Sequence, residues 1–344
     1  MRNTTFWLFF APSAFAMILF IALPIGSIFV QSFFIEHEKV FTEVEVCNPF
    51  GCKTETKVDT QATEQLQKEK PLGKFNGLGT YLNRNHLALN ELVIAWEERE
   101  KVSEFFAQMF NFPFYKALGF TLAYTFIVTP FVIILGFLIA LAVNTVSNMI
   151  KGVVIFFSLL PMIITPLIGS LILFWMIDAD GIIGSLLKLV FDDPDLSLKA
   201  SPTLTWITLM FYGIWHSAPF AFIVFYAGLQ TVPQDVVESS MMDGANIIER
   251  IRYIIIPHLM PLFIFVGLMQ LMDNFRVFEP IVGFNAEASA TSLSWIIYND
   301  LRPEGTAPLF SSAAATSVLT ILGLIILLYP VLKRNYNEYK QGTI

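Results

Sequence analysis

Six long stretches of the chain contain no charged residue, and they determine the architecture that the sequence predicts. The stretches free of Asp, Glu, Lys and Arg are 20 to 35 residues long and cover 3–35, 117–150, 152–177, 200–234, 253–272 and 305–332. A helix needs roughly 20 apolar residues to cross the hydrocarbon core of a bilayer. Membrane β-strands instead appear as alternating segments of about ten residues. The pattern therefore predicts an all-α polytopic membrane protein with six transmembrane helices.

Composition excludes the other broad classes of protein. Hydrophobic residues make up 55% of the chain and charged residues 14%, whereas a soluble domain carries about 25% charged residues. Disorder requires low hydrophobicity and high charge, so it is excluded as well. The net charge is −7, so acidic residues outnumber basic ones. We therefore expect no basic surface and no nucleic acid partner.

The first apolar segment has two interpretations. Arg2 followed by the apolar run from Phe6 to Val30 resembles a secretory signal peptide. That run is longer than the 7–15 residues of a signal-peptide core, and no small-x-small cleavage site follows before Glu36. We therefore interpret residues 1–35 as an uncleaved first transmembrane helix.

Lys and Arg are distributed unevenly between the two sides of the six segments, and this predicts their orientation. Short cytoplasmic loops are enriched in Lys and Arg. The basic residues that fall on one side are Arg2, Lys151, Arg250, Arg252, Lys333, Arg334 and Lys340. The short loops of the opposite side hold more Asp and Glu than Lys and Arg. We therefore expect both termini in the cytoplasm.

The segment 36–116 is a long polar loop that this orientation places outside the cytoplasm. It contains the only two cysteines of the chain, Cys47 and Cys52, on either side of an Asn-Pro-Phe-Gly turn. A tight turn can bring two cysteines within the 4.4–6.8 Å that a disulfide requires, and disulfides persist outside the cytoplasm. We predict a Cys47–Cys52 disulfide; two unpaired thiols are the alternative. Helical periodicity over Leu82 to Phe106 predicts one surface helix.

Several kinds of catalytic and binding chemistry are absent from the sequence. It has no phosphate-binding G-x-x-x-x-G-K-[ST] loop, no H-E-x-x-H and no G-x-S-x-G motif, and two cysteines cannot form a structural zinc site. We expect no catalytic residue, no metal and no cofactor in this chain. Within the six stretches only His216 and His258 can become charged. That argues against an ion-coupled secondary carrier, because proton relays use buried carboxylates; it also leaves few candidates for the Ser–His pair of an intramembrane protease.

The loop between the fourth and fifth segments has the pattern of two short helices joined at a glycine. Thr231-x-x-Gln234 is a candidate capping box, and Gly244 can end the first helix in a left-handed conformation. Asn246-x-x-Glu249 is a second capping pattern, and Pro257 marks the entry to the fifth segment. These signals predict a helix–glycine–helix that projects into the cytoplasm. It either docks into a groove of a partner or serves as a plain connector.

This loop resembles a known family motif. The residues Glu238-Ser-Ser-Met-Met-Asp243-Gly244-Ala245, followed by Ile256-Pro257, are similar to the EAA loop of bacterial ABC-importer permeases, here over 231–257. The preceding Ala227-Gly228-Leu229-Gln230-x-x-Pro233 resembles the carbohydrate branch of that family, the maltose and glycerol-phosphate type. The sequence departs from the pattern in Ser239-Ser240, which replace two alanines, and in the length of the 36–116 loop.

The resemblance implies partners and a mechanism. It implies a second homologous permease subunit, an ATPase homodimer that holds ATP and Mg²⁺, an extracytoplasmic solute-binding protein and the lipid of the bacterial cytoplasmic membrane. ATP-driven closure of the ATPases would move the docked loop, and the transmembrane bundles would alternate between outward and inward states. The residues that would form or support the docking contact are Glu238, Ser239, Ser240, Asp243, Gly244, Ala245, Arg250 and Pro257.

Two groups of polar residues are candidates for the substrate path. The fourth segment carries Tyr212, Trp215, His216 and Ser217, and the end of the fifth carries Gln270, Asp273 and Asn274. In the maltose-type family, the corresponding positions line the substrate pocket. Hydrogen bonding between helices is the alternative role, since polar residues within spans commonly serve it.

The sequence thus predicts three regions: a first transmembrane helix over 1–35, an extracytoplasmic loop or subdomain over 36–116, and a permease core over 117–340. The resemblance favours import of a carbohydrate, an oligo- or disaccharide. A glycerol-phosphate or polyol importer of the same type is the alternative within the family, and an ion-coupled secondary carrier is the alternative outside it.

Overall fold

A computed structural model describes residues 3–37, 40–48, 51–99, 101–193, 197–199, 201–302 and 308–340. The chain divides into two compact units, Met1–Tyr115 with Ile296–Ile321 and Lys116–Trp295 with Leu322–Ile344. Five described helices are long and apolar enough to cross a membrane, over Phe6–Gln31, Pro113–Thr145, Pro202–Leu229, Ile247–Phe275 and Phe310–Arg334. The helices over Asn148–Ile163 and Pro166–Met176, which are bent relative to each other, are together a candidate for a further membrane span. The prediction of an all-α polytopic membrane protein is confirmed, and the count of six spans and their orientation stay predictions.

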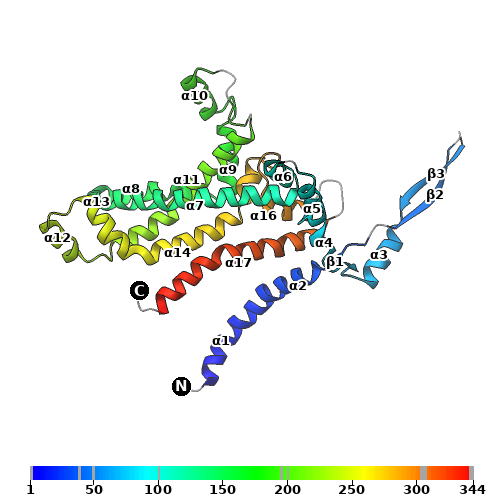
Figure 1. The fold of residues 1–344 in the computed structure, drawn as a ribbon, viewed down its shortest axis with the longest axis horizontal. Coiled ribbons are helices and arrows are strands. Elements are labelled where there is room, and N and C mark those ends of the chain that lie inside the picture. The colour runs from blue at the N-terminus through cyan, green and yellow to red at the C-terminus, as the bar shows by residue number, and fades with distance from the viewer. Residues whose placement is uncertain are drawn as a thin grey trace. The chain divides into compact units, whose positions relative to one another are not determined.

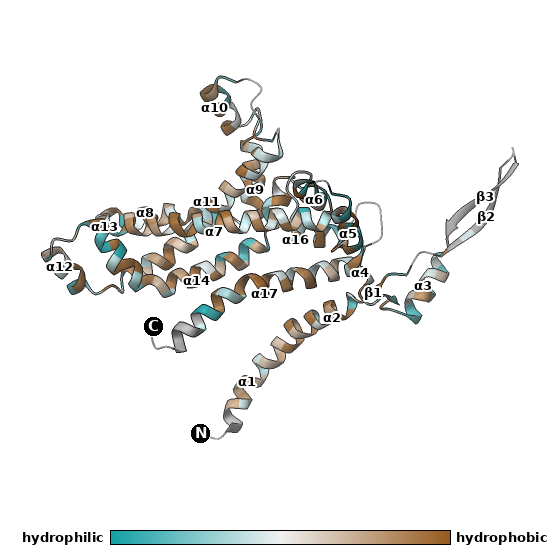
Figure 2. Ribbon diagram, viewed as in Figure 1, coloured by the Kyte–Doolittle hydropathy of each residue, from teal (hydrophilic) through white to brown (hydrophobic). Residues whose placement is uncertain are grey.

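The unit around Lys116–Trp295 is a bundle of long helices (Figure 1). Its helices include α7 (Pro113–Thr145), α8 (Asn148–Ile163), α9 (Pro166–Met176), α10 (Ile182–Phe191), α11 (Pro202–Leu229), α14 (Ile256–Phe275) and α15 (Glu279–Gly283). Of α16 (Leu293–Leu301), only Leu293–Trp295 belong to this unit. Helix α11 packs against both α8 and α14, and α9 packs against α15. Figure 2 shows hydrophobic residues along the lengths of α7 and α14. These helices are therefore apolar on most sides, as buried and lipid-facing helices are.

The core of this unit lies where α7 meets α11. Val128 and Val132 of α7 and Phe222 and Phe225 of α11 are completely buried. A Cβ on Gly136 would lie 2.5 Å from the Cβ of Ala221. Small residues allow membrane helices to approach this closely, because contacts between backbones replace the hydrophobic drive that lipid cannot supply.

Helices α8 and α9 are separated by a bend of 92°. Ile164 and Thr165 are extended there, and Pro166 opens α9. The residue before a proline is driven out of the helical region, and proline is well suited to the first turn of the next helix. One apolar stretch of the sequence, 152–177, therefore forms two helices.

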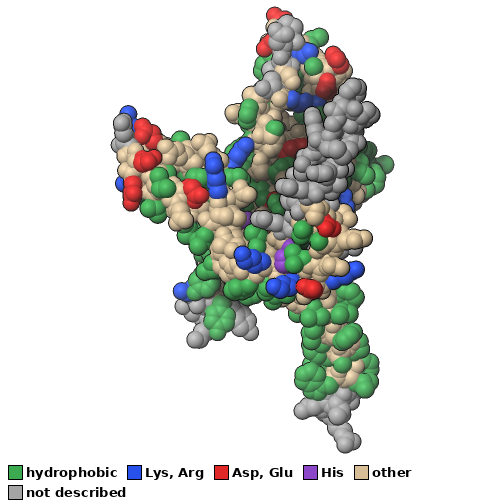
Figure 3. Space-filling model, turned by 90° about the vertical axis from the view of Figure 1, so that its right-hand side faces the viewer, with side chains coloured by type: hydrophobic (Ala, Val, Ile, Leu, Met, Phe, Trp, Pro, Cys, Tyr) green, Lys and Arg blue, Asp and Glu red, His purple; other side chains and the backbone are tan. Residues whose placement is uncertain are grey.

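The unit around Met1–Tyr115 begins with a nearly continuous apolar helix. It consists of α1 (Asn3–Met17), the π-helical segment η1 (Ile18–Ala22) and α2 (Leu23–Gln31). Its most apolar stretch buries no residue, and Figure 3 shows hydrophobic side chains around this downward-pointing helix. The other elements are β1 (Phe34–Ile35), β2 (Phe41–Asn48), β3 (Gly51–Val58), α3 (Thr60–Glu69), β4 (Lys74–Phe75), α4 (Gly79–Leu82), α5 (Leu89–Glu97) and α6 (Val102–Met109). The last helix of the chain is α17 (Phe310–Lys340).

The segment 36–116 is more structured than the sequence predicted. Strands β2 and β3 form an antiparallel hairpin, and β1 pairs with β4. The prediction of one helix over Leu82–Phe106 is wrong in extent, because α5 ends at Glu97 and α6 begins at Val102. Glu104 Oε2 accepts a hydrogen bond from Lys101 N at 3.3 Å. Such a bond from the third helical residue back to the N-cap marks the start of a new helix.

The hairpin register bears on the predicted disulfide. Cys47 lies directly opposite Cys52 in the β2–β3 pairing. Residues that face each other in antiparallel strands have Cα atoms about 4.5–5.5 Å apart, a separation that a disulfide can bridge. The two side chains lie outside those that the structure describes, so the disulfide stays a prediction.

A buried histidine joins distant segments of the same unit. His86 is fully buried, and its Nδ1 lies 2.8 Å from Asn83 Oδ1. Its Nε2 lies 3.1 Å from Thr316 Oγ1, while Ser312 Oγ donates to Asp300 Oδ2 at 2.6 Å. Burial lowers the pKa of His86 and raises the pKa of Asp300. These contacts connect the 83–86 turn to the start of α17.

Candidate substrate pathway and docking loop

A cavity of about 430 Å³ lies in the unit around Lys116–Trp295, where α11 meets the end of α14. We call it the α11–α14 cavity. Its lining residues are Tyr124, Pro166, Tyr212, Gly213, His216, Ser217, Asp273, Asn274, Arg276, Val277, Glu279 and Pro280. Most of them are polar or aromatic, although α7, α11 and α14 are strongly apolar elsewhere. The cavity therefore concentrates the polar chemistry of this unit.

Two cavity residues from α11 hold the bend between α8 and α9. Tyr212 Oη donates to Pro166 O at 2.7 Å, and His216 Nε2 lies 3.0 Å from Ile164 O. A broken helix leaves carbonyl groups without partners, and at membrane depth they must bond to protein or line a water-filled cavity. His216 Nε2 faces a carbonyl oxygen, so it carries the proton, and in the neutral ring Nδ1 remains an acceptor.

Helix α14 contributes polar residues from its last turn. Asn274 is 5% exposed, and its Nδ2 donates to Thr129 Oγ1 of α7 at 3.0 Å. Asp273 Oδ1 accepts from Arg276 Nη2 at 2.9 Å, and both of these side chains are about half exposed. The buried amide therefore connects two helices, while the ion pair lies at an accessible edge of the cavity.

The structure brings together five of the seven residues proposed for the substrate path: Tyr212, His216, Ser217, Asp273 and Asn274. Trp215 and Gln270 do not line the cavity. Trp215 is 43% exposed, and Gln270 is buried with no hydrogen-bond partner for Oε1 among the described residues. The exposure of Trp215 follows from helical geometry, since it lies on another face of α11 from its neighbours in the cavity.

The sequence reasoning missed three side chains that line this cavity, those of Tyr124, Arg276 and Glu279. Arg276 and Glu279 closely follow Asp273-Asn274 and could have been found from that proximity. Tyr124 lies far away in the sequence, inside an apolar helix. A Cβ on Gly213 would lie 2.0 Å from its hydroxyl oxygen, so the absence of a side chain there makes room for Tyr124.

The loop after α11 contains α12 (Gln234–Met242), α13 (Ile247–Arg250) and the π-turn η2 (Ile251–Ile255), which continues into α14. Gly244 has a φ of +84°, which confirms the predicted left-handed position. Gly244 N donates to Met241 O at 3.1 Å and Ala245 N donates to Ser240 O at 2.9 Å. This pair of bonds is the Schellman motif, in which a glycine ends a helix and satisfies its last carbonyls.

The two capping predictions have different outcomes. The Asn246–Glu249 box is confirmed, because Asn246 Oδ1 accepts from Glu249 N at 2.9 Å and Glu249 Oε2 accepts from Asn246 N at 2.8 Å. The box at Thr231 is wrong, because α12 begins at Gln234 after the N-cap residue Pro233. The Thr231 hydroxyl donates instead to Gly228 O at 2.8 Å, at the end of α11. Threonine commonly bonds back to such a carbonyl.

Large apolar side chains on this loop are exposed. They are Val236, Met241 and Met242 in α12, Ile247 and Ile248 in α13, and Tyr253 in η2, of which Met242 is 89% exposed. Glu238, Ser239, Asp243 and Pro257 are exposed too, while Ser240, Ala245 and Arg250 are half-buried. Arg250 Nε is buried with no partner among the described residues. A projecting apolar surface with polar neighbours is typical of a protein interaction site.

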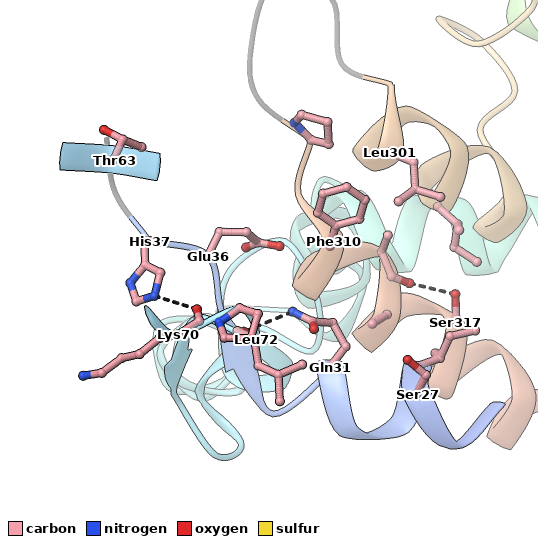
Figure 4. A pocket seen from close by; sticks show the side chains of 17 residues that line it. Ser27, Gln31, Glu36, His37, Thr63, Lys70, Leu72, Leu301, Phe310 and Ser317 are labelled. Atoms are coloured by element: carbon pink, nitrogen blue, oxygen red, sulfur yellow. Dashed lines mark hydrogen bonds between the residues drawn. The ribbon is translucent and has the colours of Figure 1, made fainter. Parts of the chain in front are cut away.

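A larger cavity of about 750 Å³ lies in the unit around Met1–Tyr115, between α2 and α17 (Figure 4). Several of its polar groups are already bonded to one another. Gln31 Nε2 donates to Leu72 O at 3.4 Å, and His37 Nε2 lies 3.1 Å from Lys70 O. Among the described residues, no group of three or more His, Cys, Asp or Glu side chains could hold a metal. The α11–α14 cavity is the better candidate, because polar and aromatic side chains from α7, α11 and α14 converge on it.

A membrane bundle with a broken helix beside a polar cavity is typical of a transport permease. The family of binding-protein-dependent transport system inner membrane components matches residues 132–333, and the chain belongs to this family. That stretch includes the loop over 231–257 and all of the cavity except Tyr124. The chain is therefore a multi-pass permease subunit of the cytoplasmic membrane and not an enzyme.

Named relatives match more than half of the chain. The multiple sugar-binding transport system permease protein MsmF of Streptococcus mutans is 29% identical over 230 residues, 65% of this chain and 77% of its own length. The sn-glycerol-3-phosphate transport system permease protein UgpA of Pectobacterium atrosepticum is 26% identical over 68% of this chain and 80% of its own length. The trehalose/maltose permease protein MalF of Thermococcus litoralis is 26% identical over 54% of this chain and 64% of its own length.

A solved structure has the same fold. It is a bacterial ABC transporter involved in the import of the acidic polysaccharide alginate, and the match has a TM-score of 0.59 at 21% identity. It covers 82% of this chain and 97% of the other.

Proposed function

We propose that this subunit belongs to an ABC importer that carries an oligo- or disaccharide across the cytoplasmic membrane. The observation that carries the proposal is the family match over residues 132–333, which contains both the docking loop and most of the cavity. Relatives named for multiple sugars and for trehalose and maltose support a carbohydrate. A cavity rich in aromatic and hydrogen-bonding groups suits such a substrate.

The transporter that we propose contains four kinds of protein. This chain pairs with a second homologous permease in the lipid bilayer. An ATPase homodimer binds ATP and Mg²⁺ on the cytoplasmic side, and a solute-binding protein delivers the substrate from outside. The alginate transporter, as solved in complex with a pentasaccharide-bound periplasmic protein, supports the last of these by analogy.

The loop over 231–257 is the proposed contact with the ATPase. Its exposed apolar side chains would enter a groove of the ATPase, and Gly244 would hold α12 and α13 at the required angle. In this topology both termini are cytoplasmic and residues 36–116 lie outside. Movement of the loop would pass through η2 into α14, whose last turn carries Asp273 and Asn274 of the cavity. ATP-driven closure would then alternate the access of the cavity.

A glycerol-phosphate importer is the second candidate, favoured by the similarity to the sn-glycerol-3-phosphate permease. An ion-coupled carrier would instead transport alone.

The experiment is purification of the tagged chain in mild detergent, identification of the co-purifying proteins, and uptake measurements after reconstitution. We expect an ATPase and a second permease in comparable amounts, with sugar uptake that requires ATP. Purification of the chain alone, with gradient-driven uptake, would contradict the proposal.

A further inference from the structure

The α11–α14 cavity is lined by the charged side chains of Asp273, Arg276 and Glu279, of which the first two are paired with each other. Asp273 and Arg276 form an ion pair at 2.9 Å and neutralise each other. Glu279, in the first turn of α15, also lines the cavity. Among the described residues, no cation or hydrogen-bond donor pairs with its carboxylate. The cavity therefore presents one uncompensated negative charge.

The other groups of the cavity add hydrogen-bonding capacity. His216 donates from Nε2 to a backbone carbonyl oxygen, which leaves its Nδ1 for other partners. Tyr124 and Tyr212 add aromatic rings, and Ser217 and Asn274 add groups that can donate or accept. Carboxylates accept strong, charge-assisted hydrogen bonds from hydroxyl groups. This set suits a ligand with many hydroxyl groups and no negative charge.

A second negative charge in the cavity would be opposed by Glu279. Two like charges about 6 Å apart, at an effective dielectric constant of about 20, repel by an amount that weakens binding about 100-fold. Water in an open cavity reduces this effect, so we expect discrimination of at least about tenfold.

We propose that the cavity selects uncharged glycans and rejects glycans that carry a carboxylate or a phosphate, with Glu279 as the specificity-determining residue. This inference rests on the proposed function, in which the cavity lies on the substrate path. The fold alone does not fix the charge of the substrate, because the structural relative imports an acidic polysaccharide and one sequence relative is named for glycerol phosphate.

The test uses the whole transporter in lipid nanodiscs without its solute-binding protein, so that only the membrane cavity selects. The two probes are a neutral oligosaccharide that the transporter accepts and the same molecule with one terminal hydroxymethyl group oxidised to a carboxylate. The quantity measured is the ratio of their dissociation constants. We expect the oxidised probe to bind at least about tenfold more weakly to the native protein.

Three variants locate the cause of that ratio. Glu279→Gln keeps the shape of the side chain and is expected to bring the ratio close to one. Glu287→Gln removes a carboxylate of the same unit that does not line the cavity, and it is expected to leave the ratio unchanged. Ser217→Phe fills the cavity and is expected to weaken binding of both probes at least about tenfold.

The outcomes separate the two proposals. A ratio that Glu279→Gln does not change, together with weaker binding of both probes to Ser217→Phe, overturns the selection by charge and leaves the cavity on the substrate path. Unchanged binding of both probes to all three variants overturns the cavity as the substrate path, and the inference fails with it.

Discussion

The docking loop and the α11–α14 cavity both depend on polar groups, but they are assembled over very different distances along the chain. The loop closes through neighbours, as in the Asn246–Glu249 box and the bond from Ala245 N to Ser240 O. The cavity joins groups that are about 150 residues apart, as in the bond from Asn274 to Thr129. The loop can therefore keep its shape while it moves, whereas any change of the helix packing changes the cavity.

The largest effect is expected from Gly244, because the whole loop turns there. A Cβ at Gly244 would meet no atom within 4 Å, so a side chain there causes no clash. The φ of +84° alone disfavours another residue at this position. A left-handed conformation costs an ordinary L-residue about 1–2 kcal/mol, Asn tolerates it, and a β-branched residue is a genuine outlier there.

We therefore expect ATPase recovery in the pull-down to fall about fivefold in Gly244→Ala and more than tenfold in Gly244→Val. Gly244→Asn is the matched control and should bind nearly as the native protein does. Equal binding by the Val and Asn variants would show that the left-handed turn has no role in docking.

The next effect tests the long-range assembly of the cavity. Thr129→Val leaves the buried Asn274 amide without its partner in α7, and such interhelical bonds contribute about 0.6–1.7 kcal/mol. We expect a lower unfolding temperature and weaker sugar binding. Thr125→Val is the control, since the bond that Thr125 Oγ1 makes among the described residues is to Thr121 O of its own helix, at 2.7 Å. The same loss in both variants would mean that the link between α7 and α14 contributes nothing specific.

A smaller effect is expected at the second loop helix. Asn246→Ala removes the N-cap of α13, which contributes about 1 kcal/mol. ATPase recovery should fall by no more than about fivefold, with sugar binding unchanged. Asn246→Asp keeps an oxygen acceptor and should restore recovery. A loss of sugar binding in Asn246→Ala would contradict the independence of the loop from the cavity.

The smallest effect is expected at His86, whose contacts join distant segments of the unit around Met1–Tyr115. Burial lowers the pKa of His86 below its ordinary value of 6.5, so the folded protein binds fewer protons than the unfolded protein below that pH. Stability should therefore fall as the pH falls from about 6.5 through the pKa of folded His86. The raised pKa of Asp300 acts in the opposite direction, and Asp300 is present in both proteins compared below.

Differential scanning calorimetry at pH 7.5 and pH 5.5 measures this effect. The unfolding temperature of the native protein should drop by more than that of His86→Gln. An identical drop in both would show that His86 does not titrate differently on folding.

The same contrast explains what the sequence could predict. The apolar stretches, Gly244 and the Asn246–Glu249 box were recognisable because short-range rules govern helices, turns and caps. The Thr231 box failed because α11 extends to Leu229 and uses the threonine hydroxyl at its own end. The β2–β3 hairpin was missed although Val44 and Val46 alternate with charged residues, because the cysteines and the charge of the segment suggested a loop.

Tyr124 could not be recognised from the sequence, because only the packing of α7 against Gly213 brings its hydroxyl into the cavity. Trp215 was included because it is next to His216 in the sequence. The two side chains leave the helix in different directions, and only that of His216 lines the cavity.

The central claim, that sugar passes through the α11–α14 cavity, is tested most directly by substrate protection of single cysteines. Cys47 and Cys52 are replaced by serine, and Ser217→Cys or Trp215→Cys is introduced into the reconstituted transporter. Saturating sugar should slow labelling of Ser217→Cys by a thiol reagent at least about tenfold and leave the exposed Trp215→Cys unaffected. Equal labelling of Ser217→Cys with and without sugar would contradict the claim.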